Sequence, residues 1–357
     1  MSQYGYADPI DQAVEELTFV LDESWTPVDL GEVIDGNHQQ PMPTVLRRND
    51  GEHLFYPGSI NGVHGDSGAG KGWLVCFTIE QEIRAGHNVL LLDFEDTAIS
   101  IVARLLGMGV DPDRIRRHVL YVRPQTEFNK PAVDHVIDLC ITHNVTMVVV
   151  DSVGEAFALE GIDENKDVEV GPWYRRVARR IADTGPGVVL IDHSTKASDN
   201  PLHPSGSKRK RAAITGASYL AEAVKAFVKG EGGRLKLTCA KDRHGNYRKG
   251  EIVGNLVMAK SLTNAVRLEL HEPDSTDRTD EMGVIIAARA AVAAAKAEGA
   301  PLSKTSLRGL MKVKASTDAK RAGLDLAITR GALAETPGPR GAKLVEYVHD
   351  LPEEVPT

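Results

Sequence analysis

The sequence predicts an α/β protein with a mostly parallel sheet, and three observations lead to that prediction. Helical and apolar segments alternate through the middle of the chain, as they do where helices join parallel strands. The apolar segments are continuous (VLLLDF, TMVVVD), which is typical of strands buried on both faces. A glycine-rich motif, GDSGAGKG at residues 65–72, lies between an extended run and a helical pattern. Strand, glycine loop and helix in this order favour an anion-binding turn.

The individual elements follow from apolar spacing and from the residues that interrupt it. An extended run at residues 59–63 precedes the glycine motif, and residues 73–84 have apolar side chains at helical spacing. Ala85 and Gly86 end this helix. Beyond it we expect strand 88–94, helix 97–107, strand 118–123, helix 132–143, strand 145–151, helix 171–183, strand 187–192, a hairpin of 221–229 with 234–240, and strands 252–258 and 264–271.

Charge is distributed unevenly along the chain. The net charge is −8, but residues 1–60 hold 11 acidic and 2 basic residues, whereas residues 281–343 hold 5 acidic and 11 basic ones. The acidic total therefore describes a separate N-terminal segment and does not exclude nucleic acid as a partner. We expect an acidic N-terminal extension with a short helix near residues 10–20, a core domain, a linker and a small C-terminal domain, with boundaries 1–55, 56–272, 273–282 and 283–350.

The C-terminal segment has the pattern of a winged helix-turn-helix domain. It contains an alanine-rich helical stretch, two helical stretches that each follow a capping serine (Ser303 and Ser316), and two short extended pieces separated by PGPRG. The expected helices are 284–297, 304–312 and 317–330, and the expected wing strands are 332–336 and 343–348.

This predicted domain would dock on DNA through its third helix. Lys320 and Arg321 lie on that helix, and Arg340 and Lys343 lie on the wing. Winged domains also dock on proteins, and that alternative stays open.

Composition argues against a membrane or secreted protein. No apolar run approaches the roughly 20 residues that cross a bilayer, and the acidic N-terminus lacks the regions of a signal peptide. The cysteines, Cys76, Cys140 and Cys239, are odd in number and lie in apolar segments without metal-ligand spacing. We therefore expect a cytoplasmic location (the host cytoplasm for a phage-encoded chain) and no membrane partner.

Residues 65–72 match the phosphate-loop pattern G-x-x-x-x-G-K. Glycines allow a tight turn whose N–H groups point at phosphate oxygens, and Lys71 adds a positive charge near the β- and γ-phosphates. Gly72 stands where a Ser or Thr hydroxyl usually holds Mg²⁺, which puts metal placement in question but not nucleotide binding. The alternative is a glycine-rich turn with a chance lysine. The predicted nucleotide-binding residues are Gly65, Asp66, Ser67, Gly68, Ala69, Gly70, Lys71, Gly72 and Trp73.

Acidic residues follow two of the predicted strands. Asp151 ends TMVVVD, where a carboxylate near a phosphate loop would orient Mg²⁺; the plainer interpretation is an ordinary strand-end aspartate. Glu95 follows NVLLLDF and is our candidate general base, provided that its strand lies beside the loop strand. Asp93 and Asp96 compete for that role. DFEDT also fits an acidic helix N-terminus without catalytic function.

Polar and basic residues follow the later strands. His193 comes directly after GVVLID and is placed to sense the γ-phosphate, or else to bond only the loop backbone. The long connection 196–216, expected to be irregular, holds four consecutive basic residues that would contact DNA phosphates, although charge runs are usually only solvated. These predicted DNA-binding residues are Lys208, Arg209, Lys210 and Arg211.

Lys241 and Arg243 follow a hairpin strand in CAKDRHG. Sequence does not assign them to the loop's own pocket. They would instead protrude and reach the nucleotide of a neighbouring subunit, where an arginine stabilises phosphoryl transfer. The alternative is a surface K-x-R at a turn.

The order GDSGAGKG, LLLDFED, MVVVDS, VVLIDH and KDR resembles that of RecA-like P-loop ATPases, most closely the RepA- and DnaB-like hexameric helicases and the RepA-like ATPases of actinobacteria and their phages. The resemblance covers about residues 25–270. It implies ATP and Mg²⁺ as cofactors, Lys71 on the phosphates and Asp151 on the metal. It also implies Glu95 as the catalytic glutamate, His193 as the sensor, and Lys241 with Arg243 as an element inserted into the adjacent subunit. Gly72 and the wing-like C-terminal domain depart from the family pattern.

Three functions are therefore weighed. The first is a DNA-dependent ATPase that forms a ring, with a hexamer expected, and translocates on or unwinds single- or double-stranded DNA. The second is a nucleotide-binding DNA-loading factor or switch with little or no hydrolysis, for which Gly72 is the reason. The third is a recombinase-like filament, which uses the same core.

Overall fold

The structure, a computed structural model, describes residues 27, 29–36, 40–194, 202–228, 230–259, 265–273, 275–313, 317–339 and 342–352. The chain divides into two compact units, residues 1–41 and 42–357. The first unit includes the short helix α2 (Gly31–Ile34). The helix predicted near residues 10–20 lies outside the described residues.

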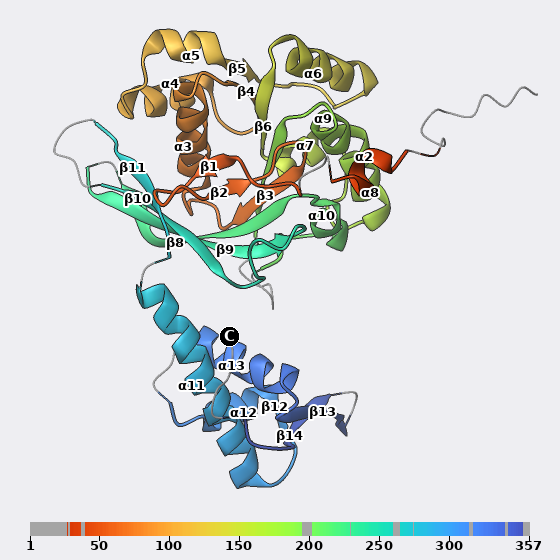
Figure 1. The fold of residues 1–357 in the computed structure, drawn as a ribbon, viewed down its shortest axis with the longest axis vertical. Coiled ribbons are helices and arrows are strands. Elements are labelled where there is room, and N and C mark those ends of the chain that lie inside the picture. The colour runs from red at the N-terminus through yellow and green to blue at the C-terminus, as the bar shows by residue number, and fades with distance from the viewer. Residues whose placement is uncertain are drawn as a thin grey trace, which may run out of the picture. The chain divides into compact units, whose positions relative to one another are not determined.

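A nine-stranded sheet forms the centre of the second unit (Figure 1). Its order is β11-β10-β9-β8-β3-β7-β6-β4-β5. The six strands from β8 to β5 run parallel to their neighbours, and β9, β10 and β11 extend the sheet in antiparallel fashion. The predicted mostly parallel sheet is confirmed. The strands are β3 (Ile60–Gly65), β4 (Asn88–Asp93), β5 (Val119–Val122), β6 (Val145–Asp151), β7 (Gly187–His193), β8 (Ala217–Val228), β9 (Gly232–Asp242), β10 (Ile252–Met258) and β11 (Leu268–His271).

Helices cover both faces of the parallel strands, because each strand carries apolar side chains on both sides. In β4, Val89 and Leu91 belong to one hydrophobic core, whereas Leu90 and Leu92 belong to the other. The first core also contains side chains of α3, α4 and α5, and the second those of α6 to α9. The helices are α3 (Lys71–Arg84), α4 (Ala98–Gly107), α5 (Pro112–His118), α6 (Lys130–Thr142), α7 (Val153–Leu159), α8 (Asp167–Tyr174), the π-helix η2 (Arg175–Arg179), α9 (Arg180–Ala182) and α10 (Lys208–Ala213).

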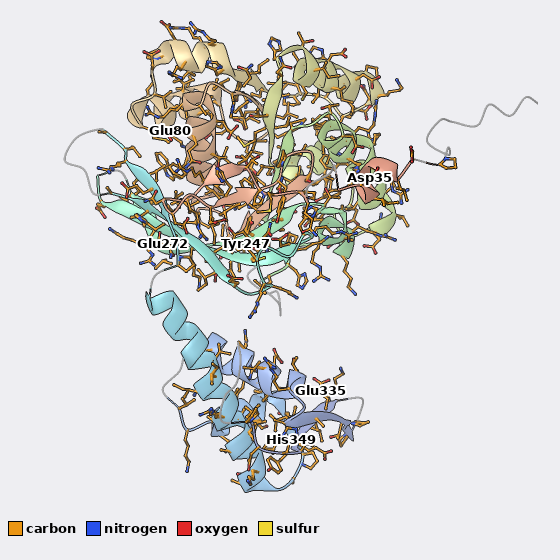
Figure 2. All side chains as sticks on the ribbon, in the orientation of Figure 1. Asp35, Glu80, Tyr247, Glu272, Glu335 and His349 are labelled. Carbon is orange, nitrogen blue, oxygen red and sulfur yellow. The ribbon has the colours of Figure 1, made fainter. Side chains whose placement is uncertain are left out.

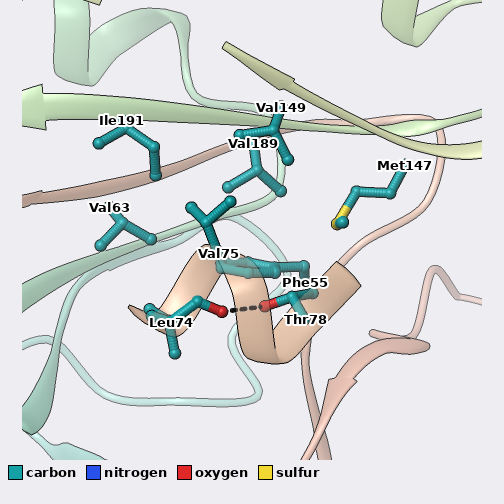
Figure 3. Close-up of a pocket in the computed structure, with 9 residues that line it drawn as sticks. All are labelled: Phe55, Val63, Leu74, Val75, Thr78, Met147, Val149, Val189 and Ile191. Carbon is teal, nitrogen blue, oxygen red and sulfur yellow. Dashed lines mark hydrogen bonds between the residues drawn. The ribbon is translucent and has the colours of Figure 1, made fainter. Parts of the chain in front are cut away.

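Helix α3 is held against the sheet by a wholly buried apolar contact (Figure 3). Leu74 and Val75 lie against strand residues such as Val149 and Val189, around a small apolar cavity. The hydroxyl of Thr78 donates to the carbonyl oxygen of Leu74 at 2.8 Å, so it has a partner inside the helix. The cavity is therefore a packing gap, and the contact fixes the helix that follows the glycine loop.

Several elements differ from the sequence prediction. Helices α5 and α7 were not expected, and the predicted helix 171–183 begins earlier, at Asp167, and contains the π-helical segment. A hairpin of β1 (Val45–Arg47) and β2 (His53–Phe55) packs Leu46, Leu54 and Phe55 into the first core. The division between the two compact units, at residues 41 and 42, lies before this hairpin. Strands of three residues are too short to give a periodic signal.

The C-terminal part has its own hydrophobic core, made of residues from Ala287 onward. Its three-stranded sheet has the order β12-β14-β13. The three predicted helices are confirmed, but a third strand, β12, was not expected, and α11 begins at Ser275, so the predicted linker 273–282 is largely helical. The elements are α11 (Ser275–Glu298), β12 (Leu302–Ser303), α12 (Lys304–Leu310), α13 (Thr317–Thr329), β13 (Leu333–Pro337) and β14 (Lys343–Tyr347).

Close helix contact and charge pairing hold this part together. A Cβ atom on Gly323 of α13 would lie 2.6 Å from the backbone nitrogen of Ala288, so the helices approach closely because residue 323 is glycine. The carboxylate of Glu335, which Figure 2 labels on the C-terminal part, pairs with two lysines. It lies 2.8 Å from Nζ of Lys304 and 2.9 Å from Nζ of Lys343. Ser303 caps α12, as predicted, by accepting from the backbone N–H of Ser306. Among the described residues, no helix combines the length and apolarity needed to cross a membrane.

Candidate functional site

The glycine motif forms a tight loop between β3 and α3. Gly68 and Gly70 have φ values of +75° and +105°, a region that side-chain-bearing residues rarely adopt. A Cβ on Gly65 would lie only 2.2 Å from the carbonyl oxygen of Ala221 on the neighbouring strand β8. Glycine is therefore required at these positions for steric reasons, and the predicted strand–loop–helix setting is confirmed.

Lys71 is buried at the first position of α3. Its ammonium donates to the carbonyl oxygens of Gly65 and Asp66, at 2.8 and 3.0 Å, so the cation lies inside the loop. Burial lowers the pKa of Lys71, while the charges of Asp151 and Glu95 oppose that shift. A bound phosphate would replace these neutral acceptors with negatively charged ones, which adds Coulomb attraction to each hydrogen bond of the ammonium.

The parallel register brings the predicted acidic and histidine residues to one edge of the sheet. Gly65 lies opposite His193, and Asp93 lies opposite Asp151. The strand of Glu95, β4, does not neighbour the loop strand β3, because β7 and β6 lie between them. The strand of Glu95 therefore does not lie beside the loop strand, as the prediction required. Glu95 still lies at this edge because all four strands end there.

Glu95 is held by two partners from neighbouring strands. Its carboxylate accepts a hydrogen bond from the hydroxyl of Ser152, and Nε2 of His193 lies 3.0 Å from Oε1. Burial on its own would raise the pKa of Glu95, but the hydrogen bonds from Ser152 and His193 outweigh it, and the pKa is lowered. Glu95 is therefore an ionised carboxylate at neutral pH, able to accept a proton from water. Ser152 was not identified from the sequence, because a serine after a strand has no distinguishing pattern.

Asp93, one of the competitors of Glu95, has a structural role. It is buried and accepts from the backbone N–H groups of Glu95 and Asp96, at 3.1 and 2.8 Å, and from the hydroxyl of Tyr121 at 3.0 Å. These bonds shape the turn that presents Glu95. Asp96 instead pairs with Arg104, with 3.4 Å between Oδ2 and Nη2.

Asp151 has a strongly perturbed carboxyl group. Burial, together with the charges of Glu95 and Asp93, raises its pKa to about 7, while Lys71 opposes the shift. A cation such as Mg²⁺ would favour the ionised form, so the carboxyl fits a metal-orienting role. Among the described residues no three acidic, histidine or cysteine side chains form a metal cage by themselves. When bound, Mg²⁺ would neutralise phosphate charge.

The basic run is corrected in two respects. Residues 208–213 form helix α10, capped by the hydroxyl of Ser207, where an irregular loop was expected. Lys210 is 1% exposed, and its ammonium lies 2.8 Å from Glu164 and 2.9 Å from Asp192. The predicted DNA contact is therefore wrong for Lys210, whose charge neutralises the buried carboxylate of Asp192 and pairs with the partly exposed Glu164. Lys208 and Arg209 are exposed, and Arg211 is half-buried beside His203.

Lys241 does not protrude, so that part of the prediction is wrong. Its ammonium donates to the carbonyl oxygens at the end of α10, those of Arg211 (3.0 Å), Ala212 (3.2 Å) and Ile214 (2.6 Å). Three donors with three acceptors leave no N–H for a phosphate. Arg243 is exposed. In the C-terminal part, Arg321 is exposed on α13, and Lys320 is half-buried with its Nζ 3.4 Å from the carbonyl oxygen of Met311.

A family model described as an AAA domain matches residues 47–199. The matched range contains the glycine loop, Glu95, Asp151 and His193. No curated protein matches the sequence. The RecA-like core, a glycine loop with a buried lysine, and this match together support a nucleotide-binding domain of the P-loop ATPase class.

The raised pKa of Asp151 predicts a pH-dependent stability effect. The folded chain keeps the Asp151 proton up to about pH 7, whereas the ordinary value is 3.8, so wild-type stability falls as the pH rises between these values. Asp151→Asn removes the ionisation and should stabilise the nucleotide-free protein more at pH 8 than at pH 5, with a difference on the order of 1–3 kcal/mol. Urea unfolding at the two pH values measures this.

The matched control is Asp138→Asn, an exposed carboxylate on α6. It should change stability by less than about 0.5 kcal/mol at either pH. An Asp151→Asn variant with the same effect at pH 5 and pH 8 would contradict the assignment.

Proposed function

We propose that the protein is a DNA-dependent ATP motor, a ring-forming helicase or translocase of the RepA- and DnaB-like kind. ATP would bind at the glycine loop, with Lys71 on the phosphates and Asp151 orienting Mg²⁺. Glu95 would take a proton from the attacking water. The observation that carries the proposal is a continuous path of contacts from Glu95 to the basic helix α10.

That path runs through the end of β7. Glu95 contacts the ring of His193, and the preceding residue, Asp192, pairs with the buried ammonium of Lys210 on α10. Burial raises the pKa of Asp192 and the charge of Lys210 opposes the shift, which is expected of a carboxylate that depends on this one cation. A change in the hydrogen bonding of His193 on phosphate release would therefore move the strand end and α10 together.

Helix α10 carries exposed positive charge at the end of this path. Lys208 and Arg209 face solvent in its first turn, and Arg211 lies in its last turn. Lysine and arginine side chains bind nucleic-acid phosphates without sequence preference, as a translocating motor requires. These residues are our proposed contacts with single-stranded DNA.

A second path connects α10 with Arg243. Lys241 clamps the carbonyl end of α10, and Arg243 is two residues further along the chain. In a hexameric ring, Arg243 would reach the nucleotide of the adjacent subunit and stabilise the transition state. Helix α10 would then respond to nucleotides on both sides of its subunit, which favours coordinated movement along DNA.

The C-terminal part would position the motor on its substrate. We interpret its three helices and three-stranded sheet as a winged helix-turn-helix domain, with Lys320 and Arg321 on the helix that enters the major groove. The exposure of Arg321 supports this use of α13.

A second candidate function is a nucleotide-binding switch that loads other factors on DNA and hydrolyses ATP slowly. Gly72 favours it, since the loop lacks the hydroxyl that holds Mg²⁺. Steady-state ATP hydrolysis with and without single-stranded DNA separates the two functions. Stimulated turnover supports the motor, and turnover near zero under both conditions supports the switch.

Replacement of Glu95 by Gln should separate binding from hydrolysis. The variant keeps the size of the side chain and its contact with Ser152 but loses the base, so turnover should fall by about 10²–10⁴-fold. Affinity for ATP should change by less than about threefold, because the carboxylate acts on water. Hydrolysis and equilibrium nucleotide binding are measured on the same preparation, and undiminished turnover would remove Glu95 from its role.

Removal of the exposed charges of α10 should weaken DNA binding. The double variant Lys208→Ala/Arg209→Ala loses two phosphate contacts, so the slope of log K against log salt for single-stranded DNA should become shallower by about 1.4. Nucleotide affinity should not change. Lys130→Ala, which removes an exposed lysine on α6, is the matched control and should leave the slope as in the wild type. Equal slopes for all three proteins would exclude α10 as the DNA contact.

A further inference from the structure

An arginine from α4 fills the space beside Gly72 in the phosphate loop. A Cβ atom on Gly72 would lie 2.9 Å from Nη1 of Arg104, closer than such atoms approach in folded proteins. A serine or threonine at residue 72 would therefore displace the end of the flexible Arg104 side chain from this position. The space that a hydroxyl-bearing side chain at residue 72 would occupy is filled by Arg104, 32 residues further along the sequence.

Three contacts hold the Arg104 side chain in this place. Its Nη2 lies 3.4 Å from Oδ2 of Asp96, directly after the candidate base Glu95. Its guanidinium lies over the ring of Trp73, 5.4 Å from the ring centroid. Burial raises the pKa of the Cys76 thiol to about 11, and the charge and hydrogen bond of Arg104 oppose that shift, so Cys76 lies against the same group.

These contacts fix Arg104 over the first turn of α3. Residues 72 and 73 lie in the first turn of that helix and residue 76 lies in the next turn, so the guanidinium lies beside the helix end that would face a bound phosphate. The side chain of Arg104 is 29% exposed. Arginine stays charged at any physiological pH and binds phosphate oxygens through two N–H groups at once.

The position of Arg104 matters because of what residue 72 usually does. In P-loops the residue after the lysine gives a hydroxyl to Mg²⁺, and the ion neutralises the β- and γ-phosphates. In this chain the same space holds a fixed positive charge without an oxygen ligand. The charge that the phosphates require is thereby supplied, in part, by the protein.

We infer that Arg104 is a phosphate-binding residue of this P-loop, supplied from α4 in the same subunit, and that Gly72 makes room for it. The guanidinium contacts the β- or γ-phosphate oxygens of the bound nucleotide, so binding depends only weakly on Mg²⁺. The inference rests on nucleotide binding at the loop and is independent of any action on DNA.

Calorimetric titration of a non-hydrolysable ATP analogue, with Mg²⁺ and with EDTA, tests this inference. The wild type should bind under both conditions, with Kd values within about fivefold of each other. Arg104→Ala should lose about 10–100-fold in affinity in EDTA, as expected for a charged hydrogen bond, and recover part of it with Mg²⁺. The affinity of Arg104→Lys in EDTA should lie between those of the wild type and Arg104→Ala.

The reciprocal variants distinguish a phosphate contact from a structural role. Gly72→Ser alone should bind less tightly than the wild type because its side chain meets Arg104. The double variant Gly72→Ser/Arg104→Ala should bind tightly with Mg²⁺ and weakly in EDTA, as a loop with its metal-binding hydroxyl restored. Arg116→Ala, which removes an exposed arginine on α5, is the matched control and should behave as the wild type.

Two results would overturn the inference. A wild type that binds only with Mg²⁺ would exclude a protein charge in place of the ion. An Arg104→Ala variant with a lower melting temperature but an unchanged ratio of the two Kd values would make Arg104 a structural partner of Trp73 and Asp96. If the wild type binds no nucleotide under either condition, the nucleotide site itself is refuted. If DNA does not stimulate ATP hydrolysis while the nucleotide affinities are as predicted, only the proposed DNA motor function is contradicted.

Discussion

The ammonium of Lys71, buried inside the glycine loop, is the interaction on which the rest of the site depends. A buried lysine is costly unless acceptors and negative charges surround it. The carbonyl oxygens of Gly65 and Asp66 are the acceptors, and the carboxylates of Asp151 and Glu95 are the negative charges. The loop is built only because glycine allows the left-handed turn at Gly70. A cation held by backbone carbonyl oxygens beside a tight glycine turn is a site prepared for phosphate.

The parallel sheet determines which residues surround that cation. Strands β3, β7, β6 and β4 end at one edge, so side chains far apart in the sequence meet there. Glu95 is bonded by Ser152 and His193, and Asp151 lies beside it with a raised pKa. The pKa values of two carboxyl groups in one site are thus shifted in opposite directions, which suits different tasks for base and metal-orienting group. The edge continues into α10 through Asp192 and Lys210.

The sequence predicted the sheet and the edge residues well, because strong local signals specify them. Apolar runs of strand length and the glycine motif located β3, α3, β4, β6 and β7 to within one or two residues. The short hairpin of β1 and β2 gave no such signal. The sequence also did not predict ion pairs between distant residues. A run of four basic residues does not show that Lys210 points inward to Asp192 and Glu164. Likewise, nothing in the sequence connects Gly72 with Arg104, because that contact exists only after α4 packs beside α3.

The central claim is that the glycine loop binds a nucleotide through Lys71, and nucleotide titration tests it most directly. An ATP analogue titrated into the wild type and into Lys71→Ala, with folding of both verified by circular dichroism, measures it. The wild type should show one saturable site, and the variant should lose at least about tenfold in affinity, as expected for a lost charge-assisted hydrogen bond. Equal affinities, or no uptake by the wild type, would contradict it.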